Sequence, residues 1–292
     1  MPPTSRKFRH ALEYAGFRSA EALFASLPVE RASALSGRMW RAVAPRLSRH
    51  ARALAHLRQA LPELDEAQRE AIAGDMWECL GRVFAESFHI EELVRPDRFE
   101  IVRENFWRAE AARARGRGFV VCAPHLANWE IAAGALGRLG LSTSGVYQRM
   151  TNPRVDAHVH AMRAAFYPGG LLPKEPGTAR KLLRMLREGT SVALLADLRD
   201  PTGVRVPFFG QDAPTTKFPA LLARTLDVPL VAGRVIRLPN AHFRAEMERI
   251  DVPRTKDAEA DMVAATAQVQ AIFERWIREN PGQWMWAHRR WG

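Results

Sequence analysis

The stretch of the chain whose residues are best suited to catalysis is PHLANWE, which spans residues 124–130 and contains a histidine and a glutamate. His125 and Glu130 are five positions apart, so on one continuous helix their side chains would point about 140° apart. They can meet if the histidine lies in a loop and the glutamate in the first turn of the next helix. A carboxylate on one imidazole nitrogen would fix the tautomer and leave the other nitrogen free to take a proton from an alcohol.

The same two residues also have a simpler explanation. Glu130 could complement the dipole of the following helix, and His125 could be an ordinary polar loop residue. A histidine and a glutamate at this spacing form a weak pattern by themselves. The hypothesis of a general base therefore depends on the elements that position the pair.

The segment before the pair predicts a buried strand that ends next to the histidine. The sequence FVVCA at 119–123 is β-branched and aromatic, and it would deliver His125 to the carboxyl end of a sheet, where open α/β folds bind ligands. Asn128 is a natural N-cap, which places Glu130 in the first turn of the next helix. This arrangement makes the contact between His125 and Glu130 possible.

The rest of the chain predicts an α/β fold with a central mixed, mainly parallel sheet flanked by helices. Buried strands are expected at 191–197 and 228–236, with helices at 178–188 and 217–226 before them, and 243–250 alternates like an edge strand. A final amphipathic helix is expected to end at Asn280-Pro281.

Residues 1–100 are predicted to be a helical, membrane-associating N-terminal portion, and residues 101–292 the α/β body, the two forming one compact unit. A helix at 6–27 is expected to end at Pro28, and Asp65 with Gln68 makes a capping signal for another. No signal peptide is expected in residues 1–30, which lack an uninterrupted apolar core.

The charge of the chain favours a polyanionic partner. Lys and Arg outnumber Asp and Glu by 43 to 32, for a net charge of +11. No zinc-finger spacing or RNP-type strand motif accompanies this charge, so an anionic membrane or an acidic protein is favoured over nucleic acid. The most apolar early segment, 11–28, carries too many charges for a membrane span, so a peripheral or monotopic contact is expected. Cys79 and Cys122 are predicted to be reduced core residues.

Five ordered stretches across residues 65–292 carry a family resemblance. They read HLANWE at 125–130, VYQRMTNP at 146–153, LLADLRD at 194–200, RVPFFGQDAPTT at 205–216 and PGQWMWAHRRWG at 281–292. In these stretches the chain resembles the bacterial lipid A biosynthesis acyltransferase family (lauroyl/myristoyl late acyltransferases), within the wider lysophospholipid-acyltransferase-like group.

The resemblance implies transfer of an acyl chain from acyl carrier protein or acyl-CoA to a hydroxyl of a membrane lipid, with a lipid A precursor as the favoured acceptor. It implies no cofactor and no metal, and a place on the cytoplasmic face of the bacterial inner membrane. The family's H-x4-D/E pair corresponds to His125, as general base, and Glu130. Another lipid acceptor, such as a lysophospholipid, is the alternative within the same chemistry.

The resemblance also suggests a set of substrate-binding residues. Arg149 is displaced by one position from the family's basic residue, so Arg163 is the alternative anchor for a phosphate or the thioester oxygen. Asp197 is the best match to the family's D-Q-D motif, whose second residue is not kept here. The full predicted set is Asn128, Arg149, Arg163, Asp197, Arg205, Phe208, Phe209 and Lys217, in which the two phenylalanines would form a buried pair at a turn beside the acyl pocket.

Two other classes of function stay open at this point. His125, His158 and His160 with Asp197 and Asp200 could suggest a metal-dependent hydrolase, and a non-catalytic membrane-surface protein could keep the same fold. The aromatic and basic C-terminus could contact lipid headgroups or pack in the core; we expect a mixture, with Trp284 buried and Arg289 and Arg290 facing the site.

Overall fold

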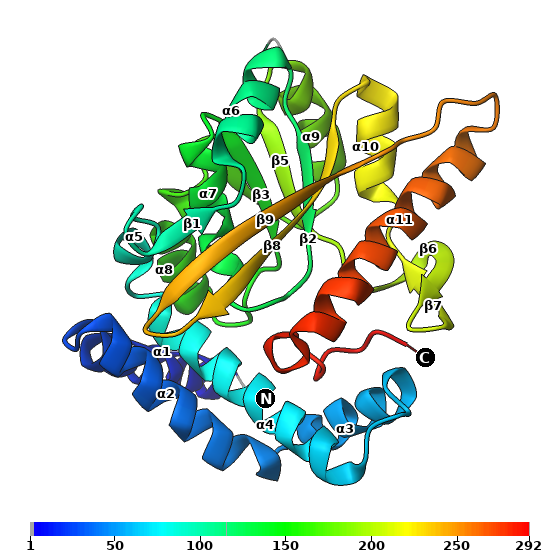
Figure 1. The fold of residues 1–292 in the computed structure, drawn as a ribbon. Helices are drawn as coiled ribbons and strands as arrows, with labels where there is room; N and C mark the ends of the chain where they lie inside the picture. The colour runs from blue at the N-terminus through cyan, green and yellow to red at the C-terminus, as the bar shows by residue number, and fades with distance from the viewer. Residues whose placement is uncertain (1–2, 115, 292) are drawn as a thin grey trace.

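The computed structural model describes residues 3–114 and 116–291, which form a mixed sheet wrapped by helices (Figure 1). The seven-stranded sheet has the order β1-β9-β8-β2-β5-β3-β4, and only the β8–β9 pair is antiparallel. Its strands are β1 Phe99–Ile101, β2 Val120–Ala123, β3 Thr143–Tyr147, β4 Gly170–Pro173, β5 Ser191–Leu195, β8 Leu230–Leu238 and β9 His242–Ile250. The predicted α/β class with a mainly parallel sheet is confirmed.

The prediction that residues 243–250 form an edge strand is wrong. Strand β9 pairs with β8 on one side and with β1 on the other, and β1 is the edge. Alternation of apolar and polar residues reports that one face of a strand is less buried, but it does not report how many neighbours the strand has. The short strands β1, β3 and β4 were not predicted.

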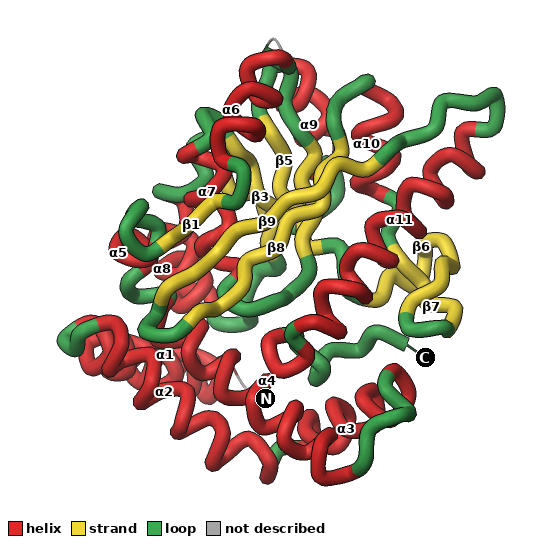
Figure 2. The backbone as a smooth tube through the Cα atoms, viewed as in Figure 1, coloured by secondary structure: helices red, strands yellow, loops and turns green. Residues whose placement is uncertain are grey.

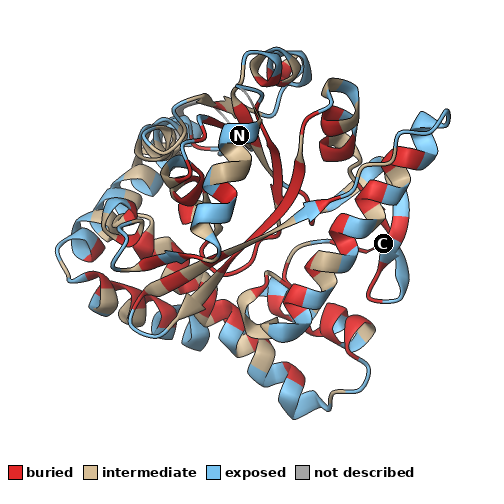
Figure 3. Cartoon of the chain, turned by 45° about the horizontal axis from the view of Figure 1, so that its top comes forward, coloured by how far each residue is buried: buried red, intermediate tan, exposed pale blue. Residues whose placement is uncertain are grey.

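Both faces of the central strand β2 are buried, which the continuous apolar run of this strand reflects. Val120 and Cys122 belong to a core cluster on one face, and Val121 belongs to a cluster on the other. Figure 3 shows buried residues concentrated on the strands and on the inner sides of the helices. The helices of the α/β body are α6 Glu104–Arg113, α7 Ala132–Arg138, α8 Pro153–Ala164, α9 Thr178–Arg187, α10 Phe218–Leu226 and α11 Ala258–Glu279.

Several sequence predictions for helices are confirmed. Helices α9, α10 and α11 match the expected segments, and α11 is followed by Asn280-Pro281 as predicted. At the start of α4 (Glu66–Glu86), the Asp65 carboxylate accepts a hydrogen bond from the Gln68 backbone N–H at 2.8 Å, and the Gln68 side chain accepts one from the Asp65 N–H at 2.9 Å. This reciprocal arrangement is a capping box.

The N-terminal portion is helical and lies at one end of the sheet (Figures 1 and 2). It contains α1 Pro3–Ala25, α2 Val29–Val43, the short 3-10 turn η1 Ala44–Arg46, α3 Ser48–Ala60, α4 Glu66–Glu86 and α5 Ile90–Leu93. Across the described residues, no helix combines the length and apolar character needed to cross a membrane. The predicted division at residue 100 falls inside β1 and stays a prediction.

Helices α2 and α4 approach closely because small residues line their contact. A Cβ added to Gly81 would lie 2.6 Å from the backbone oxygen of Ser36, so no larger residue fits at this position. The Ser36 hydroxyl donates to the Gly81 carbonyl at 2.6 Å. This contact fixes α2 against α4 and so sets the position of the next feature, the buried end of α4.

The residues VPFFG end the first strand and form the turn of a separate hairpin, made of β6 Arg199–Phe208 and β7 Gln211–Thr215, with Phe209 and Gly210 in the turn itself. Phe209 and Gly210 both have positive φ, at 52° and 70°. Phe208 and Phe209 are buried, which confirms the predicted turn with an aromatic pair. They pack against the indoles of Trp284, Trp286 and Trp291 in the C-terminal segment.

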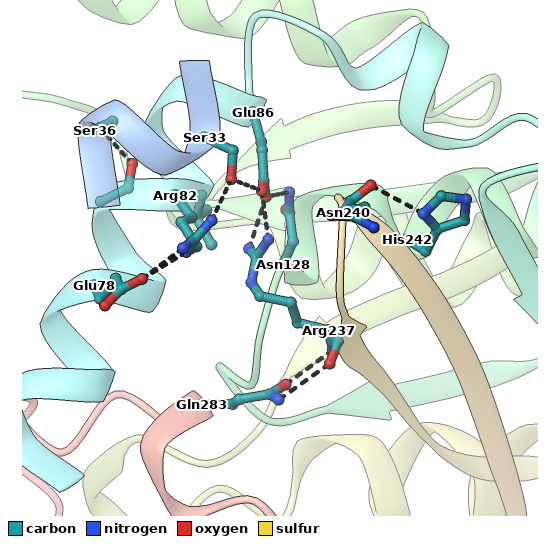
Figure 4. Close-up of polar contacts among 12 residues, drawn as sticks. Ser33, Ser36, Glu78, Arg82, Glu86, Asn128, Arg237, Asn240, His242 and Gln283 are labelled. Carbon is teal, nitrogen blue, oxygen red and sulfur yellow. Dashed lines mark hydrogen bonds and ion pairs between the residues drawn. The ribbon is translucent and has the colours of Figure 1, made fainter. Parts of the chain in front are cut away.

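A buried ion pair joins the last turn of α4 to the sheet (Figure 4). The Glu86 carboxylate is fully buried and forms a bidentate pair with Arg237 on β8, with one contact of 2.7 Å and one shorter. It also accepts hydrogen bonds from Ser33 on α2 at 2.7 Å and from Asn128 at 2.8 Å. Burial alone would raise the pKa of Glu86, but the Arg237 charge and these hydrogen bonds outweigh it and lower the pKa.

We predict that replacement of Glu86 by Ala is strongly destabilising. The substitution leaves the buried Arg237 guanidinium without its counter-charge, which costs roughly 3–5 kcal/mol of unfolding free energy. Glu78→Ala on the same helix is the matched control, because Glu78 pairs with the partly exposed Arg41 and Arg82 and should cost about 0–1 kcal/mol. Denaturant unfolding measures both, and equal losses would contradict the buried-pair interpretation.

Candidate active site

The candidate site forms where two neighbouring parallel strands end. His125 follows β2, and Asp197 follows β5, its hydrogen-bonded neighbour in the sheet. Ala123 lies opposite Leu195 in this register, so the chain delivers both side chains to the same edge. The His125 ring nitrogen Nδ1 lies 2.7 Å from Asp197 Oδ1, and the His125 backbone N–H donates to Oδ2 at 2.7 Å.

Asp197 is a buried carboxylate held by three N–H groups. Besides the two donors of His125, the indole Nε1 of Trp284 donates to Oδ2 at 2.7 Å. Only 1% of the Asp197 side chain is exposed. Burial alone would raise its pKa, but the charge and hydrogen bonds of His125 and the bond from Trp284 outweigh burial and lower the pKa to about 2. The carboxylate is therefore ionised at neutral pH.

This contact determines the tautomer of the histidine. With the proton on Nδ1 donated to Asp197, the lone pair of the neutral ring lies on Nε2. No hydrogen bond joins Nε2 to another residue in the described part of the chain, and 11% of the His125 side chain is exposed. The ring is thus oriented by a buried carboxylate, and its Nε2 is available to accept a proton.

The expected pairing of Glu130 with His125 is wrong. Glu130 instead accepts hydrogen bonds from Arg163 Nη2 at 2.5 Å and from the Trp129 indole at 3.1 Å. Asp197 already occupies the Nδ1 side of the imidazole. Between His125 and Glu130, the backbone at Ala127 has a positive φ of 48°, which changes the direction of the chain.

Asn128 has a positioning role in the loop after the histidine. Its side-chain oxygen accepts from the Glu130 backbone N–H at 3.2 Å, which confirms the predicted cap, although the first turn is the 3-10 turn η2 Trp129–Ile131. Its amide donates to Glu86, and the residue is fully buried. Asn128 therefore connects the loop to the Glu86–Arg237 pair (Figure 4).

Two aromatic rings pack against the His125 imidazole. Ring centroids of Trp129 and His288 lie 5.1 and 5.3 Å from its centroid. Burial of the His288 ring, together with the charge of His125, lowers the pKa of His288 to about 4. His288 is therefore neutral at physiological pH and adds no positive charge beside His125.

The C-terminal segment forms one wall of the site. The His125 carbonyl accepts a hydrogen bond from the Met285 N–H at 3.3 Å, and the Ala127 N–H donates to the Gln283 carbonyl at 2.8 Å. Gln283 is fixed in turn, because its side chain bonds the backbone N–H and C=O of Arg237 at 2.9 and 3.3 Å. The loop with the histidine is thus held between the N-terminal helices and the end of the chain.

The predicted burial of Trp284 is confirmed, but the prediction that Arg290 faces the site is wrong. Arg290 is fully buried and donates to Thr215 Oγ1 at 2.8 Å and to Gln270 Oε1 at 3.0 Å. Its guanidinium lies 4.5 Å from the ring centroid of Phe208. Burial lowers the pKa of Arg290 to about 10. Carbonyl, hydroxyl, amide and π-face contacts hold this cation inside the core.

Not all of the predicted substrate-binding residues gather at the histidine. Arg163 meets Glu130, and Phe208 lies behind Trp284, with 5.8 Å between ring centroids. Three basic residues lie elsewhere: Arg149 is exposed beside Glu175, Arg205 is exposed on β6, and Lys217 pairs with Glu259 at 2.5 Å. Their predicted contacts with substrate stay predictions.

The histidines of the metal alternative have other partners. His158 Nε2 lies 2.9 Å from Glu21 Oε1, and His160 Nε2 lies 3.1 Å from the Leu171 carbonyl. In residues 3–114 and 116–291, no group of three or more His, Cys, Asp or Glu side chains is arranged to hold a metal ion. Cys79 and Cys122 are both buried and form no disulfide.

The functional contacts that sequence reasoning missed connect distant segments. Trp284 and His288 belong to a stretch already singled out for its composition, but neither was assigned to the histidine. Glu86 and Arg237 carried no sequence signal, because a glutamate in a helix and an arginine in a strand are ordinary residues.

An imidazole with one nitrogen on a buried carboxylate and the other unoccupied can accept a proton from a hydroxyl. Comparison with protein families matches the family described as bacterial lipid A biosynthesis acyltransferase over residues 1–292, the whole chain. A comparison with curated proteins finds no match. Because the family match spans the full sequence, the chain belongs to the bacterial lipid A biosynthesis acyltransferase family.

Proposed function

We propose that this acyltransferase moves a fatty acyl chain from the thioester of acyl carrier protein, or of acyl-CoA, to a hydroxyl of a membrane lipid, with His125 as general base. A lipid A precursor is the acceptor we favour, given the family. The observation that carries the proposal is the contact between His125 Nδ1 and the buried Asp197 carboxylate. It leaves Nε2 as the basic atom at the carboxyl end of the sheet.

The proposed reaction needs no covalent enzyme intermediate. The acceptor hydroxyl gives its proton to His125 Nε2 while its oxygen attacks the thioester carbonyl carbon, so that a tetrahedral oxyanion forms. The C–S bond then breaks, the acyl chain stays on the acceptor oxygen, and the thiolate leaves with the proton from the imidazolium. Asp197 stabilises the imidazolium between these two steps, since its carboxylate is already ionised and bonded to Nδ1.

Glu130 and Arg163 have a different proposed role from the one that their sequence pattern suggests. The Glu130 carboxylate holds one nitrogen of the Arg163 guanidinium at 2.5 Å. A guanidinium has five N–H donors, so further donors remain for a substrate oxygen. We propose that Glu130 positions Arg163 to bind the oxyanion or a phosphate of the acceptor or donor.

We propose a peripheral place for the protein on the cytoplasmic face of the bacterial inner membrane, where both substrates would be available. The chain has a net charge of +11, which favours an anionic lipid surface. Acyl carrier protein or acyl-CoA would approach from the water side as donor.

His125→Ala should reduce transfer by about 10²–10⁴-fold, since the substitution removes the group that accepts the proton. Release of free thiol from an acyl thioester in the presence of a lipid acceptor measures the effect, and circular dichroism checks the fold. Transfer by this variant near the level of the unaltered protein would exclude the proposed mechanism.

The variants Asp197→Asn and Glu130→Gln should distinguish the roles of the two carboxylates. The amide at 197 cannot stabilise the imidazolium and favours the wrong tautomer, so kcat should fall by a factor on the order of 10²–10⁴. Glu130→Gln keeps an oxygen for Arg163 and should lose less activity. A larger loss in Glu130→Gln than in Asp197→Asn would show that Glu130, and not Asp197, is the partner of the base.

His288 should make the free energy of unfolding depend on pH. In the unfolded chain, His288 takes up a proton below its ordinary pKa of about 6.5. In the folded protein, it takes up the proton only near pH 4. Its contribution is therefore present above about pH 6.5 and is lost as the pH falls toward 4. In His288→Gln, the loss of unfolding free energy between these values should be smaller by of order 1–2 kcal/mol. Urea unfolding at several pH values measures this, and equal pH slopes for the two proteins would refute it.

A further inference from the structure

Large apolar side chains are exposed where α2 ends and α3 begins. Met39 is 51% exposed, Val43 56% and Leu47 44%, and the indole of Trp40 between them is 37% exposed. Met39 and Val43 are one helical turn apart and so lie on the same face of α2. Leu47 follows the 3-10 turn η1 and precedes α3. We call the segment that carries these exposed side chains the α2–α3 corner (residues 38–49).

Arginines surround the apolar residues of the α2–α3 corner. Arg38, Arg46 and Arg49 are all exposed. Within residues 3–114 and 116–291, none of the three forms an ion pair, whereas Arg41 pairs with Asp75 and Glu78 on the other side of α2. Exposed apolar side chains with unpaired cations beside them are the combination that binds the headgroup region of an anionic bilayer.

The α2–α3 corner is connected to the candidate active site through α3. His56 Nδ1 lies 2.8 Å from the Trp286 carbonyl, and Arg52 donates to the Ala287 carbonyl at 3.3 Å. The next residue, His288, packs against His125. In Figure 1, α2 and α3 lie at the same end of the molecule as the C-terminal segment. A lipid surface at this corner would therefore lie beside the site.

We infer that the α2–α3 corner docks on the surface of an anionic phospholipid bilayer and so presents the site to a lipid hydroxyl. The statement that docking presents the site to a lipid hydroxyl rests on the proposed function. The binding of the corner to the bilayer can be measured without turnover. A bilayer fits better than an acidic protein because the corner exposes large apolar side chains as well as arginines, and it lies at the outer edge of the helical portion (Figure 1). There its apolar side chains enter the interface while the arginines meet lipid phosphates.

Vesicle co-sedimentation with the full chain tests the inference. The unaltered protein should bind vesicles of phosphatidylcholine with phosphatidylglycerol more tightly than vesicles of phosphatidylcholine alone. The double variant Met39→Glu, Val43→Glu should lose about tenfold or more in binding, since two apolar contacts are replaced by charges that the anionic surface repels. Arg38→Gln and Arg46→Gln should each lose about fivefold on the anionic vesicles only.

Phe106→Glu is the matched control. Phe106 is 39% exposed on α6, at the opposite end of the molecule from α2 and α3 (Figure 1), and its substitution should leave vesicle binding unchanged. Thiol release with a detergent-dispersed acceptor should be normal in the Met39→Glu, Val43→Glu variant. If neither the unaltered protein nor the variant transfers acyl chains, the proposed function fails, and vesicle binding still decides this inference.

Three results would overturn the inference. The first is vesicle binding by the Met39→Glu, Val43→Glu variant equal to that of the unaltered protein. The second is an equal loss of binding in Phe106→Glu. The third is normal vesicle binding by the corner variants together with lost binding of acyl carrier protein, which would make the α2–α3 corner a docking site for the acidic donor protein instead.

Discussion

The Asp197 carboxylate is the group on which the candidate site depends. A buried charge is unfavourable unless it is paired and hydrogen-bonded, and Asp197 meets this requirement with three N–H donors from two distant parts of the chain. The His125 backbone and ring come from the loop after β2, and the Trp284 indole comes from the C-terminal segment. Satisfying one buried acid therefore orients the histidine and docks the end of the chain at the same time.

A second buried carboxylate, Glu86, holds the same loop through Asn128. Glu86 binds Asn128 and Arg237, and through them it ties the N-terminal helices to the loop and to β8. The loop between these two acids contains Ala127 in a left-handed conformation, which a residue with a side chain adopts only under tertiary constraint. Two charged networks, and not the loop sequence alone, therefore hold the histidine in place.

The chemistry proposed for this site gives different roles to two carboxylates that come from different segments of the chain, Asp197 after β5 and Glu130 in η2. Asp197 is placed to stabilise a positive imidazolium, whereas Glu130 is placed to hold the cationic Arg163. The first would act on the proton and the second on the negative charge that develops on the substrate oxygen. The neutral His288 beside the base keeps additional positive charge away from the ring.

The sequence by itself determined the family, the α/β class, the strand that ends at His125, the Asn128 cap and the buried phenylalanine pair, since each depends on local pattern or ordered motifs. Only the tertiary structure decided the partner of the histidine. Asp197 is 72 positions from His125, and the two meet because β2 and β5 are neighbours in a sheet whose strand order does not follow the chain. The burial of Arg290 and the internal place of β9 likewise depend on contacts between distant segments, which periodicity and spacing do not encode.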